Sequence, residues 1–306
     1  PTVAKLAKIV TQLGQEERSN RLPSLEPISR QQTIPLSFGQ EQLWFITQLV
    51  PSEPIYNETF TIHLGGDINI QALSNSFKEL IRRHEILRTT FRVVNGQPVQ
   101  EIHPPSRLTL PVVDLRFLPE TERETEGLRI ATEQLRTAFD LARSPLLRAT
   151  LIQLGETDYR LYLVVHHIVV DGESLTSIFF PELETLYGAF SQGLPSPLPE
   201  LTIQYADFAV WQRQWLQGAI ISNQLAYWEK QLENLPQLQL PTDRPHNPQT
   251  TFAGSRLCFT LSKDLTEKLK TISRKEGVTL FMTLAAAIKV LLYRYSSQED
   301  IVKIGR

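Results

Sequence analysis

Only one cysteine, Cys258, occurs in the 306-residue sequence. A single thiol excludes an internal disulfide, and six scattered histidines with one cysteine offer no spacing typical of a zinc site. We interpret Cys258 as a buried structural thiol, because it lies in a segment expected to be a strand. The sequence therefore predicts neither a disulfide framework nor a structural metal.

The sequence also lacks an excess of charge of either sign and a long hydrophobic run. Its 31 Lys and Arg residues against 33 Asp and Glu give a net charge of −2, so no basic field would attract nucleic acid or anionic lipid. The longest apolar runs are far shorter than the roughly 20 residues that span a bilayer, and no signal peptide opens the chain. We therefore expect a cytoplasmic protein that binds neither nucleic acid nor membrane.

The chain length suits two lobes of ordinary size. Residues 1–13 carry apolar side chains at helical spacing, and the polar segment 14–34 is typical of a linker. A first lobe is expected at 35–190, and the proline-rich stretch that follows begins an inter-lobe connector and a second lobe at 191–306. Because residues 300–306 resemble the opening of a strand, we expect the C-terminal lobe to be partial.

Hydrophobic periodicity and turn residues predict the elements of both lobes. Helices are expected at 38–49, 70–83, 120–139, 175–190 (with a kink at Pro181), 263–276 and 279–295, with two aromatic-rich helices after residue 200. Strands are expected at 58–64, 88–94, 98–103, 146–154, 160–166 and 256–261, with a hairpin turn at Asn95-Gly96. Their mixed order predicts an α/β fold built as α+β sandwich layers.

One stretch combines a buried strand with two adjacent histidines. Residues 161–165 form a continuous apolar run, typical of a strand covered on both faces, and the run ends at His166 and His167. Because neighbours on a strand alternate faces, one ring should be structural and the other should face a cavity. Asp171 and Gly172 follow, and we expect the glycine to allow a sharp turn into a helix that offers free N–H groups.

A neutral imidazole and backbone donors in a dry pocket suit acyl transfer, in which an oxyanion develops as a nucleophile adds to a carbonyl. No serine nucleophile is indicated, because Ser174 does not lie in a Gly-x-Ser-x-Gly elbow and suits a helix start better. Direct attack by a second substrate fits best. The residues alone leave an alternative open: both histidines are satisfied core residues, and Asp171 simply begins a helix.

A carboxylate buried at Asp171 would need a cation, for which a bidentate arginine is best. The candidates lie in segment 82–91, at a junction between helix and strand. We expect Arg88 to be the partner, with Arg83 as second choice; solvated surface arginines are the alternative.

The pattern His166-His167-x-x-x-Asp171-Gly172 resembles the active-site motif of nonribosomal peptide synthetase condensation domains, which have the chloramphenicol-acetyltransferase-like fold. Segments 37–45, 83–91 and 205–211 resemble the first, second and fourth motifs of that family, in the same order. The resemblance covers the chain from about residue 35 to its end. It implies a complete N-terminal lobe and a C-terminal lobe that lacks the later motifs.

The resemblance implies amide-bond formation between an upstream acyl or peptidyl thioester and the amine of an aminoacyl thioester. Each substrate would be tethered to a carrier protein by a phosphopantetheine arm, and no cofactor would bind this chain directly. His167 would be the catalytic histidine, as a base or by positioning the amine, with His166, Asp171 and Gly172 beside it. An adjacent adenylation domain is also implied.

Residues 1–13 resemble the last helix of a carrier protein, which implies a donor carrier upstream in the same chain. One departure is Glu173, where the family often has a bulky apolar residue. Because later motifs are absent, residues 1–306 could be inactive alone. A non-catalytic module of the same fold that docks carrier proteins is the alternative function, and the intact histidine motif argues against it.

Overall fold

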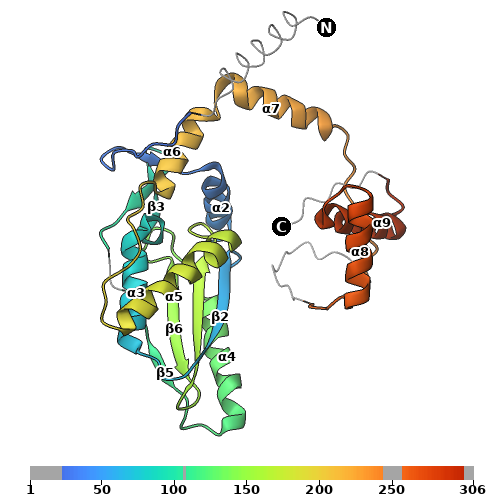
Figure 1. Ribbon diagram of the computed structural model, residues 1–306. Helices are drawn as coiled ribbons and strands as arrows, with labels where there is room; N and C mark the ends of the chain where they lie inside the picture. Colours follow the sequence, from blue (N-terminus) through green and yellow to red (C-terminus); the bar gives the residue numbers. More distant parts are fainter. Residues whose placement is uncertain (1–22, 106–107, 244–256, 300–306) are drawn as a thin grey trace, which may run out of the picture. The chain divides into compact units, whose positions relative to one another are not determined.

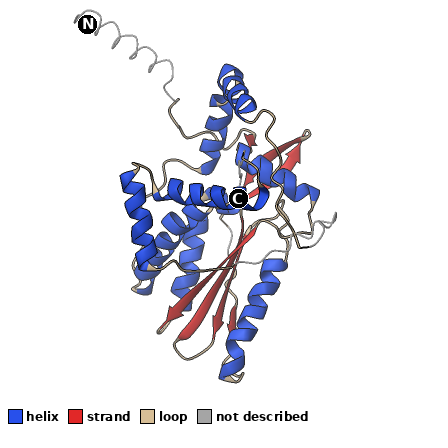
Figure 2. Cartoon of the chain, turned by 90° about the vertical axis from the view of Figure 1, so that its right-hand side faces the viewer, coloured by secondary structure: helices blue, strands red, loops and turns tan. Residues whose placement is uncertain are grey.

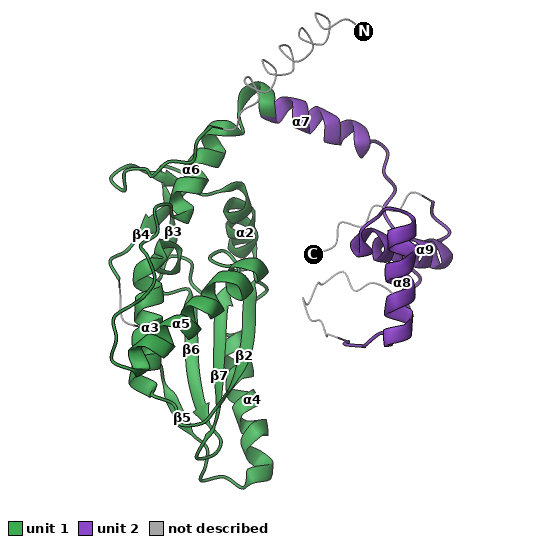
Figure 3. Ribbon diagram, viewed as in Figure 1, with its two compact units in different colours: residues 1–220 green, residues 221–306 purple. Residues whose placement is uncertain are grey.

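The computed structural model describes residues 23–105, 108–243 and 257–299 (Figure 1). It divides into two compact units, residues 1–220 and 221–306 (Figure 3), which are described separately. The helix expected at 1–13, the first part of the expected linker and the strand opening expected at 300–306 lie outside the described residues.

A four-stranded sheet in the order β2-β7-β6-β5 forms the centre of the first unit. The strands β2 (Asn57–Gly65), β7 (Asp158–His166) and β6 (Leu147–Gln153) are antiparallel, and β5 (Val112–Asp114) runs parallel to β6. The apolar run 161–165 is buried along its whole length, because β7 lies between two strands and is covered on both faces.

Helices cover the two faces of this sheet (Figure 2). The helices α3 (Ile70–Arg83) and α5 (Phe180–Ser191) share a core with Leu161 and Leu163 of β7. On the other face, α4 (Glu120–Arg136) packs on Tyr162. A Cβ on Gly127 of α4 would lie 3.5 Å from the Tyr162 hydroxyl, an ordinary van der Waals contact, so the close packing of α4 on the sheet does not depend on a glycine there.

A smaller antiparallel sheet, β1-β4-β3, completes the strands of the first unit. It consists of β1 (Ile34–Pro35), β3 (Thr89–Val94) and β4 (Gln97–Ile102). The predicted hairpin turn is confirmed, with positive φ values of 52° at Asn95 and 78° at Gly96. The short 3-10 helix η1 (Glu85–Arg88) joins α3 to this sheet, and α2 (Phe38–Leu49) follows β1.

The helix expected after the histidine motif continues into α5, but its segment η2 (Ser174–Phe179) is π-helical. The N–H of Phe180 donates to the carbonyl of Leu175, five residues earlier. Pro181 has no N–H to donate to the preceding turn, so one hydrogen bond of a regular α-helix is missing there. The wider π turn lies immediately before the position where we expected a kink.

The helix α6 (Tyr205–Trp215) belongs to the first unit, and the division between the units falls after Ile220. We expected the lobe boundary at 191–200, but this stretch contacts α3: the Pro199 carbonyl accepts from Arg83, and Glu200 pairs with Arg82. These contacts hold the connector on the first unit.

The second unit contains most of α7 (Gly218–Gln231), together with α8 (Lys263–Lys275) and α9 (Leu280–Ser296). The expected strand 256–261 is absent from residues 257–261, and Cys258 is exposed rather than buried. The described residues of this unit include no strand that could pair with it. Among the described helices none can span a bilayer alone; α8 and α9 reach the length and apolarity only together, across a bend of 105°.

Candidate functional site

His166, the last residue of β7, is buried with 3% of its surface exposed. Its ring lies between those of Tyr56 and Phe139, at centroid distances of 6.1 and 6.2 Å. Its Nδ1 accepts the backbone N–H of Ile168 at 3.1 Å. Burial, with the neighbouring His167, lowers the pKa of His166 to about 4. The His166 ring is therefore neutral at physiological pH, and its contacts hold the end of β7 in position.

His167 begins the turn that follows the strand, and its side chain is only partly buried. Its backbone N–H donates to the Tyr56 carbonyl at 2.8 Å, and its Nδ1 lies 2.7 Å from the Val170 carbonyl oxygen. A carbonyl can only accept, so Nδ1 carries the proton. In the neutral ring Nε2 therefore has a free lone pair. The two rings thus differ in burial, but His167 lies in the turn beyond β7, so strand alternation does not account for the difference.

Asp171 caps the helix that begins at Gly172. Its Oδ1 accepts the Ser174 N–H at 2.7 Å, and the Ser174 hydroxyl oxygen accepts the Asp171 N–H at 2.8 Å, which is a reciprocal capping box. These bonds from Ser174 lower the pKa of Asp171 below its ordinary value. The carboxylate is a cap on an exposed residue, which matches the alternative that the residues left open.

Gly172 does not make the sharp turn that we expected. It lies in the first helical turn without a positive φ, and a Cβ there would meet nothing within 4 Å. Because Gly172 has no side chain, the space beside the start of the helix is open. The first backbone N–H groups of the helix have no acceptor within the helix.

The expected ion pair between Asp171 and an arginine is absent from the described structure, because both candidates are bound elsewhere. Arg88 donates to the His103 carbonyl and lies 3.8 Å from Glu85, and burial lowers its pKa. Arg83 pairs with Glu182. The structure therefore brings together the two histidines, Asp171, Gly172 and Ser174, and places both arginines in other contacts.

Behind His166, the guanidinium of Arg148 lies 3.7 Å from the centroid of the Phe139 ring. It also donates to the carbonyls of Gln134, Thr137 and Ala138 at 2.8 to 3.2 Å. The residues following α4 are thereby held against the sheet, and the Phe139 ring presents its edge to His166 at 84°.

The four motif segments lie close together in the first unit. The Ser37 hydroxyl is 3.0 Å from that of Tyr205, which joins the first and fourth motifs. Gln204, the residue before the fourth motif, accepts the Glu85 N–H of the second motif at 3.0 Å. Ile168 and Val169 of the histidine motif share a hydrophobic core with Leu87 of the second motif. Burial raises the pKa of Tyr205, with a smaller contribution from the charge of Asp171.

Sequence reasoning did not identify Asp207 as a residue whose hydrogen bonds join separate segments of the chain. Its side chain is 1% exposed and accepts from Arg30, from the Ile28 N–H at 2.9 Å and from the Gln204 N–H at 2.6 Å. The signal was present, because Gln204 and Asp207 have capping-box spacing. Among the described residues no three metal-binding side chains cluster.

This fold, with its paired histidines at a strand end, is that of a condensation domain, and the chain belongs to that family. The family model described as Condensation domain matches residues 30–305. The predicted resemblance and the predicted mixed α/β fold are both confirmed.

Relatives and solved structures agree with this assignment. The chain is 47% identical over 305 residues to a subunit of the linear gramicidin synthase of Brevibacillus parabrevis, covering 99% of this chain and 6% of that protein. It is 38% identical over 270 residues to phosphinothricin tripeptide synthetase PhsC of Streptomyces viridochromogenes, covering 88% and 25%. The crystal structure of the X-domain from teicoplanin biosynthesis matches with a TM-score of 0.78 and 28% identity, covering 89% of this chain and 60% of that chain. The first condensation domain of the CDA synthetase, at 22% identity and a TM-score of 0.71, shows the same fold.

Proposed function

We propose that the chain forms amide bonds as the condensation domain of a nonribosomal peptide synthetase. The donor is an acyl or peptidyl thioester and the acceptor an aminoacyl thioester, each on the phosphopantetheine arm of a carrier protein. A donor carrier upstream in the same chain, an acceptor carrier and an adjacent adenylation domain are the partners. Because the chain matches only small parts of long synthetases, as with 6% of the gramicidin synthase relative, these partners belong to the larger assembly.

The observation that carries this proposal is the state of His167. The Nδ1–H bond to Val170 fixes the ring and leaves the Nε2 lone pair as an acceptor on a partly exposed side chain. An acceptor nitrogen is what the attacking amine requires, whether it gives up a proton or is only oriented.

The step transfers the acyl group from sulfur to nitrogen. The amine nitrogen bonds to the thioester carbonyl carbon, the C–S bond breaks, and the sulfur leaves with a proton. The proton lost by nitrogen passes to Nε2 of His167 or to solvent. An α-amine with a pKa of about 7.7 to 8.0 is partly neutral already, so either role of His167 is compatible with the chemistry.

The neighbouring motif residues support the turn that carries His167. His166, neutral because its pKa is lowered to about 4, holds the strand end without adding a second charge. Asp171 and Ser174 close the first turn of the helix. We also propose a cytoplasmic location, which rests on the sequence composition.

The test is to load donor and acceptor carriers, mix them with the full-length protein and weigh the acceptor arm by mass spectrometry. An arm heavier by the donor acyl group supports condensation. Carrier binding without transfer would contradict the enzymatic proposal and favour a docking module. One similar solved structure is a complex of an X-domain with OxyB, so the fold itself is found bound to a partner protein.

A further inference from the structure

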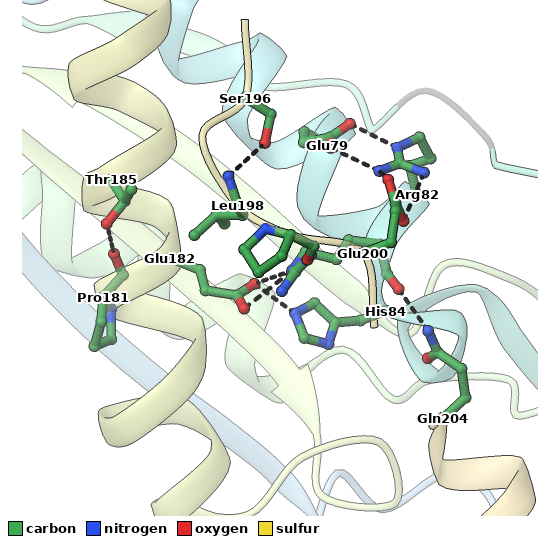
Figure 4. Close-up of polar contacts among 12 residues, drawn as sticks. Glu79, Arg82, His84, Pro181, Glu182, Thr185, Ser196, Leu198, Glu200 and Gln204 are labelled. Atoms are coloured by element: carbon green, nitrogen blue, oxygen red, sulfur yellow. Dashed lines mark hydrogen bonds and ion pairs between the residues drawn. The ribbon is translucent and has the colours of Figure 1, made fainter. Parts of the chain in front are cut away.

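Glu182 is a partly buried carboxylate to which the mechanism above gives no role. Its side chain is 14% exposed, and its two oxygens lie 3.0 Å from Nε of Arg83. Nε2 of His84 lies 2.7 Å from one of them (Figure 4). Since Arg83 is itself only 5% exposed, the cluster is a set of charge-assisted hydrogen bonds with little competition from water.

The cluster joins three segments of the chain. Arg83 and His84 lie at the C-terminal end of α3, Glu182 lies in the first turn of α5, and Arg83 also donates to the Pro199 carbonyl of the connector. Gln204 extends the network, because its amide donates to the Arg83 carbonyl at 2.9 Å. The Glu182 carboxylate therefore fixes α5 against the end of α3, and Arg83 in turn holds the connector that leads to α6.

The same helix carries the candidate site at its other end. Between the cap at Asp171 and the anchor at Glu182 lies the π-helical segment Ser174–Phe179. A π turn holds one residue more than an α turn, so relaxation of this segment to α would turn its two ends relative to each other by about 100°. The anchor at Glu182 opposes that relaxation, because α5 cannot rotate without breaking the bonds to Arg83 and His84.

We propose that Glu182 is a positioning residue for the reaction at His167. Its bonds to Arg83 and His84 hold α5 in the register that keeps residues 174–179 π-helical, and so they set the place of the turn from His167 to Asp171. The kinetic consequence rests on the proposed function, whereas the effect on the helix does not.

The test compares Glu182→Gln with Glu200→Gln in the full-length protein. Glu200 is the matched control: it pairs at 2.5 Å with Arg82, the neighbour of Arg83 on the same helix, but its side chain is 72% exposed. We expect Glu182→Gln to lower kcat for acyl transfer by about 10-fold to 100-fold with KM for both carriers nearly unchanged. Glu200→Gln should stay within about twofold of wild type.

Hydrogen exchange of the backbone amides at 174–180 supplies a readout independent of activity. We expect the Phe180 amide, which donates to the Leu175 carbonyl, to exchange at least about tenfold faster in Glu182→Gln, with amides of the sheet unchanged. Glu182→Asp keeps the charge and shortens its reach by one methylene, so it should fold and show a smaller change of the same kind.

Unchanged kcat in folded Glu182→Gln, or wild-type exchange at 174–180 in both variants, would overturn the inference. A uniform loss of protection across the first unit would also overturn it, because Glu182 would then act on stability alone. If the wild-type protein transfers no acyl group, the proposed function fails, and the exchange data still decide whether Glu182 sets the helix register.

Discussion

Replacing Asp171 by alanine should destabilise the protein only by the loss of a helix cap. The carboxylate accepts the Ser174 N–H at 2.7 Å and has no arginine partner in the described structure. Removal of a cap side chain costs typically about 1 kcal/mol, within a range of roughly 0.5 to 2. Removal of one partner from a buried ion pair, which we expected on the assumption that Asp171 is a buried carboxylate, costs about 3 to 5 kcal/mol. The two interpretations therefore differ enough to be separated.

Asp171→Asn sharpens the comparison, because asparagine is an equally good cap but lacks the charge. We expect it to lose only the interaction of the carboxylate with the helix N-terminus, about 0.3 to 1 kcal/mol. The free energy of unfolding is measured by urea denaturation for wild type, both variants, Arg88→Met and the double variant Asp171→Ala/Arg88→Met. Since Asp171 and Arg88 share no contact, their coupling energy should lie within about 0.5 kcal/mol of zero.

The stability that the Asp171 carboxylate contributes should also depend on pH, and the direction of this dependence is defined. Bonds from Ser174 hold the pKa of folded Asp171 below its ordinary value. The stability contributed by this depressed carboxyl is therefore complete above its unfolded pKa of about 4 and is lost as the pH falls through the folded pKa. A loss of stability above about 3 kcal/mol in both Asp171 variants, or a coupling energy above about 1 kcal/mol with Arg88, would refute the role of Asp171 as a helix cap. Either result would support a buried ion pair instead.

Two further predictions concern the support of the first histidine. His166 should remain neutral in the folded protein until about pH 4. Because the unfolded chain takes up this proton near pH 6.5, the free energy of unfolding should decrease as the pH falls from about 6.5 to about 4. An NMR titration of the imidazole checks the protonation, and a parallel unfolding series checks the stability. Arg148→Met removes the cation over Phe139 and the donors to three carbonyls. Urea denaturation should show a loss of about 2 kcal/mol for Arg148→Met and a clearly smaller loss for Arg129→Met, whose ion pairs on α4 are exposed. Equal losses would contradict this role of Arg148.

The sequence sufficed for elements whose pattern is local. The apolar run 161–165 predicted a strand covered on both faces, and its central place in the sheet follows from that. Asn95-Gly96 predicted the hairpin because both residues tolerate positive φ. For the helix 70–83, periodicity gave both ends correctly.

Elements whose ends depend on distant contacts were harder. We expected a helix over 120–139, but α4 ends at Arg136. Asn57 of β2 donates to the carbonyls of Leu135 and Thr137, and Arg148 of β6 donates to the same region. These donors lie far away in the sequence, so no local pattern could show that they end the helix and free Phe139 to pack on His166.

The motif singled out both histidines and Asp171 as candidate site residues, and the structure places them together, but their hydrogen bonds could not be predicted. Strand alternation did not distinguish the two rings, because His167 lies in the turn beyond β7. The partner of Asp171 was wrong, because a buried carboxylate was assumed where an exposed cap stands. Arg83, the second candidate partner, is held by Glu182 instead, and this contact depends on how α5 packs on α3.

The central claim is that His167 carries the condensation step, and single-turnover acyl transfer between loaded carriers tests it most directly. We predict that His167→Ala, folded and still binding both carriers, forms the acceptor product about 10²-fold to 10⁴-fold more slowly than wild type. His167→Gln, which keeps an acceptor atom but takes up no proton, should fall equally if Nε2 is a base and less if it positions the amine. A His167→Ala rate within about threefold of wild type would contradict the claim, because no acceptor at Nε2 would then be needed.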